Sequence, residues 1–217
     1  VYKRQIIMIL NNEDYSIGLA SIFKDTFVQN GGRLLKELYY PGNAVDFSEQ
    51  LRQVQQLRPD VVFIPGYARD SGLIVKQAQK IGVKTRFLGG DGWNDMTILT
   101  YGGAALEGSF FMTHWHPDVS FPPSRHLLQA YGQTIGDERL TSVGALTYDA
   151  VKLFSDAVKR AGSDKPDRIR EALAVTKGFE GASGRIQFDT YGDPIDKPAC
   201  IIQIREARLH LYRTISP

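Results

Sequence analysis

Three short segments of the sequence could carry chemistry, because each combines an aromatic residue and an acid with flexible glycine or asparagine. They are NNEDY at 11–15, GYARD at 66–70 and GGDGW at 89–93. A carboxylate makes charge-assisted hydrogen bonds to an ammonium, and aromatic faces cover the apolar or cationic part of a ligand. The composition of these segments therefore predicts a site for a small cationic or zwitterionic molecule.

The acids of these segments also have a simpler interpretation. Asp14, Asp91 and Asp95 could cap helices while the aromatic residues fill the core. For Asp95, which comes just before a predicted helix, we favour capping. For Asp91, which lies between glycines at the end of a predicted strand, we favour binding, because ligands sit outside the carboxyl ends of parallel strands.

Other chemistries have weaker support. His114 and His116, with Asp118 nearby, are spaced to point the same way on a strand, so a metal site is conceivable; paired histidines at an exposed crossover are more often bystanders. The sequence has no G-x-S-x-G, H-E-x-x-H or Walker motif, and no G-x-G-x-x-G follows the first predicted strand. We therefore expect binding without reaction: no enzyme, no catalytic residue, no metal and no cofactor.

The first half of the chain alternates short apolar runs with amphipathic segments, which indicates βαβ units and an α/β fold with a doubly wound parallel sheet. We expect strands at 6–10, 34–40, 61–65, 86–88 and 109–113. Helices are expected from about 17 to 30, from an N-cap at Asp46 with Glu49 in a capping box to about 57, at 71–81 and near 96–101. The apolar stripe of the first helix consists of Leu19, Ile22, Phe23, Phe27 and Val28.

The second half changes character at the proline-containing stretch 114–123, which indicates a crossover. Helices are expected at 124–135, 142–161 and 166–174, and alternating strands at 184–189 and 200–212, with turns at 191–193 and 206–207. The apolar stripe of the long helix at 142–161 consists of Val143, Leu146, Ala150, Leu153, Phe154, Ala157 and Val158. Helices followed by returning strands suggest two lobes with more than one chain crossing.

Composition excludes several classes of protein. The 217 residues are 42% hydrophobic and 23% charged, and 26 Lys and Arg against 24 Asp and Glu leave a net charge of only +2. The basic residues are dispersed, so no nucleic-acid partner is expected. No apolar run reaches the length of a membrane span. Cys200 is the only cysteine, which excludes an internal disulfide and a multi-thiolate metal site.

The first five residues, VYKRQ, are also encoded by the end sequence of a transposon used to prepare sequencing libraries. We expect residues 1–5 to be a translated adapter and exclude them from the prediction of the fold. The parent gene upstream of Ile6 tests this expectation.

Seven segments, in their order and spacing, resemble the branched-chain amino acid class of periplasmic substrate-binding proteins, the Leu/Ile/Val-binding type that serves ABC importers. The resemblance extends from Ile6 to about Leu211. The segments are NNEDYSIGLA (11–20), DFSEQL (46–51), PDVVFIPGY (59–67), KQAQKIG (76–82), FLGGDGWND (87–95), LTYDAVKL (146–153) and FEGASGRIQFDTYGDP (179–194).

This resemblance implies a type I periplasmic-binding-protein-like fold, in which two Rossmann-like lobes with parallel doubly wound sheets hold a ligand in the cleft between them. It also implies that the first lobe is incomplete in this chain. The expected domains are 1–5 (adapter), 6–116 (second lobe), 117–190 (remaining part of the first lobe) and 191–217 (returning strands and tail).

The resemblance further implies ligand contacts for Tyr15, Tyr67 and Asp91, with Asp91 taking an α-ammonium and the two tyrosines closing over the ligand. Trp93 is expected to line or edge the cleft. The groups that bind the ligand carboxylate would lie in the missing part of the first lobe. The sequence departs from the family pattern at Ser16, where glycine is common, and at Glu206-Ala207, where Asp-Gly is usual.

The function implied is capture of a small amino acid or amide outside the cytoplasm. The implied partners are a membrane permease and an ATPase, with no direct membrane insertion, and a signal peptide is expected in the missing N-terminal part. Two alternatives stay open: a ligand-sensing domain of a receptor or signalling protein with the same fold, and a cytoplasmic repressor of the lactose-repressor type. The GDGW and FDTYGDP segments argue against the repressor.

Overall fold

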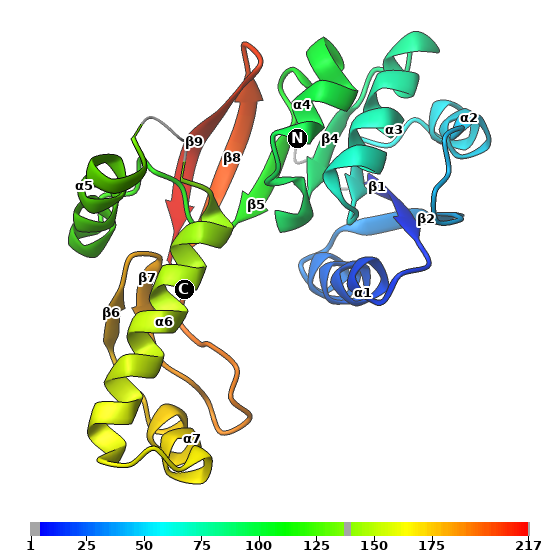
Figure 1. Ribbon diagram of the computed structural model, residues 1–217. Coiled ribbons are helices and arrows are strands. Elements are labelled where there is room, and N and C mark those ends of the chain that lie inside the picture. Colours follow the sequence, from blue (N-terminus) through cyan, green and yellow to red (C-terminus); the bar gives the residue numbers. More distant parts are fainter. Residues whose placement is uncertain (1–4, 137–139, 217) are drawn as a thin grey trace. The chain divides into compact units, whose positions relative to one another are not determined.

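A computed structural model describes residues 5–136 and 140–216, which form two compact units (Figure 1). Unit 1 contains the chain up to Met112 together with Ile202–His210, and unit 2 contains Thr113–Ile201 and the chain from Leu211 onward. Residues 1–4 of the expected adapter lie outside the described residues, whereas Gln5 begins the first strand. The assignment of each unit to one lobe of a binding protein stays a prediction.

Unit 1 alternates strands and helices, as the sequence predicts. Its elements are β1 (Gln5–Asn11), α1 (Asp14–Gln29), β2 (Arg33–Tyr40), α2 (Ser48–Leu57), β3 (Val61–Ile64), α3 (Ala68–Lys80), β4 (Arg86–Gly89), the 3₁₀ turn η1 (Asp91–Trp93), α4 (Thr97–Gly102), the 3₁₀ turn η2 (Gly103–Leu106) and β5 (Phe110–Thr113).

The strands form a sheet in the order β2-β1-β3-β4-β5-β8-β9, where β8 (Ala199–Arg205) and β9 (Arg208–Ile215) come from the end of the chain. The pairs β1–β2, β1–β3, β3–β4 and β4–β5 are parallel. The predicted class, α/β with a mainly parallel doubly wound sheet, is therefore confirmed. Because the first five strands are parallel, their carboxyl ends lie at one edge of the sheet.

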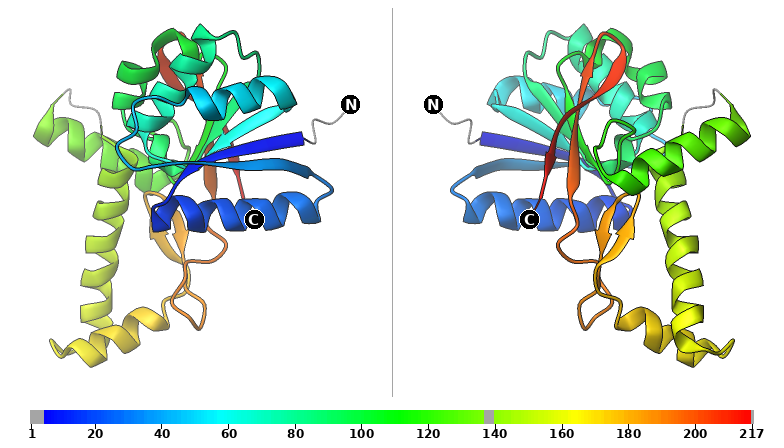
Figure 2. Two further views of the ribbon diagram at one scale, coloured as in Figure 1. Left: turned by 90° about the vertical axis from the view of Figure 1, so that its right-hand side faces the viewer. Right: turned by 90° about the vertical axis from the view of Figure 1, so that its left-hand side faces the viewer.

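Helices cover both faces of this sheet, so its central strands are apolar on both sides. Helix α1 lies on one face, where Ile6, Met8 and Leu10 form a core with Phe63 and Ala20. Helices α2 and α3 lie on the other face (Figure 2). As a result, β1 is buried continuously from its second residue. This explains why residues 6–10 are all apolar and do not alternate with polar residues.

Two helices begin three residues earlier than predicted. Helix α1 begins at Asp14 rather than at about residue 17, and α3 begins at Ala68 rather than at residue 71. Neither Glu13 nor Tyr67, the two N-cap residues, makes a side-chain cap hydrogen bond, so the usual start signal is absent from the sequence. The shift places Tyr15 in a helical first turn and Tyr67 at a helix N-terminus.

Two further sequence expectations need correction. The predicted N-cap of α2, Asp46, lies one residue before the actual N-cap, Phe47, although its carboxylate still accepts a hydrogen bond from the backbone N–H of Ser48 at 3.0 Å. In α1, Leu19, Phe23 and Phe27 of the predicted stripe pack against the core. Ile22 and Val28 are exposed, because the most buried positions of the helix are Ser16 and Ala20.

The strands β8 and β9 are joined by the predicted turn at Glu206 and Ala207. Both residues have positive φ, 52° and 54°. The turn therefore keeps the left-handed conformation that an Asp-Gly pair would adopt with less strain. Strand β8 joins β5 through the backbone N–H of Ile204, which donates to the carbonyl of Ser109 at 2.9 Å.

Besides parts of β8 and β9, the described residues of unit 2 form three helices and a short antiparallel pair of strands. These elements are α5 (Pro122–Ile135), α6 (Ser142–Ala161), α7 (Pro166–Ala174), β6 (Phe179–Gly181) and β7 (Gly184–Ile186). Strand β7 is shorter than the predicted 184–189, and β6 was not predicted. The turn at 191–193 is present, with Asp189 Oδ1 accepting from the backbone N–H groups of Tyr191 and Asp193.

A buried carboxylate fastens the β6–β7 turn to α6. Asp149 Oδ1 accepts from the N–H of Ala182 at 2.7 Å, and Oδ2 accepts from the N–H of Ser183 at 2.8 Å. The Ser183 hydroxyl donates to the same carboxylate and accepts from Lys197. Burial lowers the pKa of the Lys197 ammonium, while the charge of Asp149 acts in the opposite direction. Asp149 is therefore the residue that holds this turn in place.

The predicted apolar stripe of α6 divides into two faces. The buried face contains Ala145, Leu153 and Ala157. Val143, predicted in the same stripe, is 68% exposed and Phe154 is 53% exposed. The long helix therefore presents a second, exposed apolar face.

Candidate functional site

Three of the predicted site residues meet at the carboxyl edge of the unit 1 sheet. Tyr15 lies in the first turn of α1 after β1, Tyr67 is the N-cap residue of α3 after β3, and Asp91 begins η1 after β4. Since β1, β3 and β4 are neighbours, their following loops converge. The strand-end reasoning from the sequence thus places these three side chains together.

Tyr15 and Asp91 are joined by a hydrogen bond. The phenol of Tyr15 donates to Asp91 Oδ1 at 2.7 Å and accepts from the backbone N–H of Gly92 at 2.9 Å. Burial, and then the bond to Asp91, raises the pKa of the Tyr15 phenol well above its usual range. The phenol therefore remains a donor, and it fixes the carboxylate in one orientation.

Tyr67 extends the aromatic surface beside this carboxylate. Its ring stacks on that of Tyr15, with centroids 4.9 Å apart and planes inclined by 23°. Tyr67 is 50% exposed, so much of its ring faces outward. Two stacked phenol rings next to a carboxylate suit a ligand that carries both a cation and an apolar part.

Trp93 ends the 3₁₀ turn that Asp91 begins, and it is buried. None of its surface is exposed, its Nε1–H donates to the carbonyl of Ile64 at 3.1 Å, and its ring covers Gly89 so closely that a Cβ there would collide with it. Trp93 packs the end of the sheet that supports Asp91. Ligand contact by its ring stays a prediction.

The glycines of the candidate site have packing roles that sequence reasoning did not assign. A Cβ on Gly92 would lie 2.8 Å from the carbonyl oxygen of Gly66 and 3.0 Å from Tyr15 Oη. A Cβ on Gly90 would lie 2.4 Å from Leu19 Cδ2. The repeated glycines in GGDGW were the available signal: they allow the backbone on both sides of Asp91 to approach its neighbours.

Two other candidate residues, Asp95 and His116, accept hydrogen bonds from nearby backbone N–H groups. Asp95, favoured as a cap, lies one residue before Met96, the N-cap of α4; like Asp46 it is not the N-cap itself, although its Oδ1 accepts from the N–H of Thr97 at 2.7 Å. His116 Nδ1 accepts from the N–H of Asp118 at 3.2 Å in unit 2. Across residues 5–136 and 140–216, no group of three or more His, Cys, Asp or Glu side chains could hold a metal ion.

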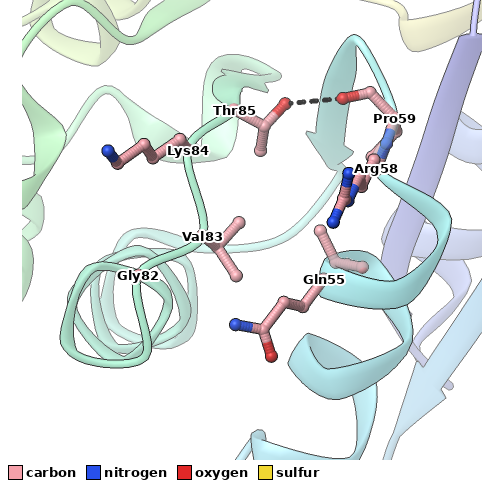
Figure 3. Close-up of a pocket in the computed structure, with 8 residues that line it drawn as sticks. Gln55, Arg58, Pro59, Gly82, Val83, Lys84 and Thr85 are labelled. Carbon is pink, nitrogen blue, oxygen red and sulfur yellow. Dashed lines mark hydrogen bonds between the residues drawn. The ribbon is translucent and has the colours of Figure 1, made fainter.

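A separate cavity of about 350 Å³ lies at the opposite edge of the unit 1 sheet, among the segments that precede β3 and β4. Figure 3 shows its lining, where the Thr85 hydroxyl donates to the carbonyl of Pro59 at 3.2 Å. Arg58 and Lys84 border it, and Val54 and Val83 contribute apolar surface. None of the predicted site residues lines this cavity, so it is distinct from the candidate site.

The fold is α/β with a doubly wound, mainly parallel sheet, and two stacked tyrosines and a carboxylate lie at the carboxyl edge of that sheet. The chain belongs to the periplasmic binding protein family, whose model matches residues 2–208. This confirms the resemblance drawn from the seven sequence segments.

Named relatives agree with this family. The chain is 29% identical over 193 residues to Leu/Ile/Val-binding protein homolog 1 of Brucella suis, covering 88% of this chain and 50% of the relative. It is 28% identical over 197 residues to the leucine-, isoleucine-, valine-, threonine- and alanine-binding protein of Pseudomonas aeruginosa, covering 88% and 51%. The chain thus spans about half the length of the curated relatives it matches.

Solved structures show the same likeness. A crystal structure of the leucine-binding protein LivK from Thermotoga maritima matches with a TM-score of 0.92 and 32% identity, over 99% of this chain and 61% of that one. LivJ from Streptococcus pneumoniae, in complex with isoleucine, matches with a TM-score of 0.86 and 25% identity, over 98% and 60%. These relatives are named as binding or transport proteins rather than enzymes.

Proposed function

We propose that this chain is part of an extracytoplasmic solute-binding protein that captures a small amino acid or amide and delivers it to an ABC importer. The observation that carries the proposal is the constellation of Asp91, Tyr15 and Tyr67 at the carboxyl edge of the sheet. The names of the relatives support it, since several are leucine-, isoleucine- or valine-binding proteins and one structure contains isoleucine.

In this proposal Asp91 binds the α-ammonium of the ligand. A carboxylate can accept about four hydrogen bonds, and Tyr15 donates one of them to Asp91. Tyr15 orients the carboxylate, and the outward-facing ring of Tyr67 covers the apolar part of the ligand. No covalent step is involved: the ligand is exchanged, not transformed.

The protein we propose has two lobes, with residues 6–116 in the second lobe, 117–190 in the first, and 191–217 returning between them. The exposed apolar face of α6 supports an incomplete first lobe, because an apolar face of this kind normally packs against a sheet. Residues that pair the ligand carboxylate would belong to the part of the first lobe outside this chain.

The partners we propose are a membrane permease and its ATPase. Within residues 5–136 and 140–216, no helix has both the length and the apolar character of a membrane-crossing segment. Permease and ATPase genes beside the parent gene would support import, whereas a fused transmembrane helix and kinase would support a sensor.

A thermal-shift screen of the full-length parent tests the ligand class. We expect leucine or another small amino acid to raise the melting temperature, and 4-methylpentanoate, which is leucine without its ammonium, to have no effect. An equal shift with both compounds would reject the role of Asp91, and no shift with any amino acid or small amide would reject the proposed function.

A further inference from the structure

Tyr40, the last residue of β2, has a buried hydroxyl that packing alone does not explain. The residue pairs with Asn11 at the end of β1, and its ring packs edge-on against Phe47 with centroids 5.1 Å apart. Tyr40 is 1% exposed, and its Oη has no hydrogen-bond partner among the described residues. A buried unpaired hydroxyl is unfavourable, and phenylalanine would fill the same space without that cost.

The hydroxyl lies against the turn that carries Tyr67. A Cβ on Gly66 would lie 3.0 Å from Tyr40 Oη and 3.6 Å from Ser71 Oγ. Ser71 is fully buried, its hydroxyl also has no partner among the described residues, and its backbone N–H donates to the carbonyl of Tyr67 at 3.1 Å. Tyr40 and Ser71 therefore close one side of Gly66.

The other side of the turn faces the loop that carries Asp91. The carbonyl oxygen of Gly66 lies 2.8 Å from the position of a Cβ on Gly92, and Tyr15 Oη lies 3.0 Å from that same position. Close contacts thus continue from Tyr40 through Gly66 and Gly92 to the phenol of Tyr15. Residues that are this closely packed cannot shift independently.

We propose that Tyr40 is a positioning residue for the site: its hydroxyl, with that of Ser71, holds the Gly66–Tyr67 turn against Gly92 and fixes the stacking of Tyr67 on Tyr15. Tyr40 acts through Gly66 and does not contact the ligand. The inference rests on the proposed function only where it treats the two tyrosines as part of the ligand-binding site.

The test uses NMR of the 217-residue chain without ligand. The readouts are the nuclear Overhauser effect between the rings of Tyr15 and Tyr67, and the indole N–H signal of Trp93, whose Nε1 donates to Ile64 beside the turn. Trp115 in unit 2 is the internal reference. We expect Tyr40→Phe to weaken the Overhauser effect and shift the Trp93 signal, and the free energy of unfolding to stay equal or increase.

The matched control is Tyr39→Phe. Tyr39 is the adjacent residue of the same strand, is half exposed, and donates its hydroxyl to Glu37 at 2.9 Å. This variant should leave both readouts unchanged. Should Tyr40→Phe fail to fold, Ser71→Ala, which removes a single oxygen from the same contact, gives the same test.

A rescue experiment separates positioning from packing. Gly66→Ala places a Cβ against Tyr40 Oη, so we expect the Overhauser effect to be lost; the double variant Gly66→Ala/Tyr40→Phe removes the opposing oxygen and should restore it. An unchanged Overhauser effect in Tyr40→Phe, or a double variant no better than Gly66→Ala, would overturn the proposal. A lower free energy of unfolding with an intact Overhauser effect would assign Tyr40 to packing and overturn it too.

The proposed function is tested separately, by titrating the full-length parent with leucine. A parent that binds no amino acid rejects the proposed function and leaves the NMR result unaffected. A parent that binds leucine, combined with unchanged ring signals in Tyr40→Phe, rejects only the positioning role.

Discussion

The phenol of Tyr15 donates a 2.7 Å hydrogen bond to Asp91 across 76 positions of the sequence. This bond links the first turn of α1 to η1 and orients the carboxylate at the edge of the sheet. A carboxylate held in this way is suited to an ammonium, because the bond from the phenol restricts its rotation before the ligand arrives.

We expect Asp91→Asn in the full-length parent to weaken amino-acid binding by about 2–5 kcal/mol, because a desolvated ammonium loses its charged partner. The fold should stay intact, since the asparagine oxygen still accepts from Tyr15. Calorimetry measures the change, and Asp95→Asn is the control at a nearby carboxylate that precedes α4. Unchanged affinity would make Asp91 structural, or show that the ligand carries no ammonium.

The 217-residue chain by itself should bind the parent's ligand only at millimolar concentration or more weakly. Half of a two-lobed binding shell loses several charge-assisted hydrogen bonds, each worth about 1.5–3 kcal/mol. Residues 6–217 can be expressed and titrated while hydrogen exchange is recorded, and we expect weak protection across α6. Tight binding, or uniform protection of Ser142–Ala161, would contradict the proposal that the first lobe is incomplete.

In the full-length parent, Asp149→Ala should destabilise the folded state by about 3 kcal/mol or more, because several buried donors would lose a charged acceptor. The backbone amides of Ala182 and Ser183 should then exchange much faster with solvent. Asp156→Ala on the same helix is the control, since it removes only an exposed ion pair with Arg160, worth under about 0.5 kcal/mol. If the two variants changed stability and amide exchange equally, Asp149 would not be the residue that holds the β6–β7 turn.

Ala207→Gly should raise the free energy of unfolding by about 1 kcal/mol. Its φ of 54° lies in the left-handed region, where a Cβ is unfavourable. Ala207→Val at the same position should have the opposite effect, because β-branched residues tolerate this region poorly. Urea denaturation compares the three proteins, and a glycine variant no more stable than wild type would show that the turn carries little strain.

The stability of the chain should fall as the pH rises above about 10. Burial, followed by the charges of Asp70 and Glu13, raises the pKa of Tyr40 in the folded state, so above that pH the unfolded chain loses a proton that the folded chain retains. Tyr40→Phe should therefore reduce the slope of stability against pH by at most about 1.4 kcal/mol per pH unit. Below pH 9 the slopes of stability against pH should be the same for wild type and for Tyr40→Phe. A difference in that range would not come from titration of Tyr40.

Much of the site was predictable because it depends on topology. Once Tyr15, Tyr67 and Asp91 were assigned to the ends of parallel strands, their convergence followed from strand direction alone. The close approach of Gly92 to Gly66 was not predictable, since it depends on the 3₁₀ turn that Asp91 begins. No periodic pattern in a sequence encodes a three-residue turn.

The helices show a second limit of the sequence. The starts of α1 and α3 were missed because Glu13 and Tyr67 make no capping hydrogen bond with their side chains. In α6, apolar residues occupy two faces, and the sequence does not reveal which of them is buried. Val143 and Leu153 therefore looked equivalent in the sequence, although only Leu153 is buried.

The order of strands in unit 1 also has a consequence during protein synthesis. Strand β8 pairs with β5, and nearby the backbone N–H of Glu206 donates to Glu107, 99 positions earlier in the chain. At typical rates of about 5–20 residues per second, β5 leaves the ribosome roughly 5–20 seconds before its neighbour exists. During that interval its unpaired edge is open to other chains. The edge of β5 is therefore protected only once the last strands of the sheet have been made.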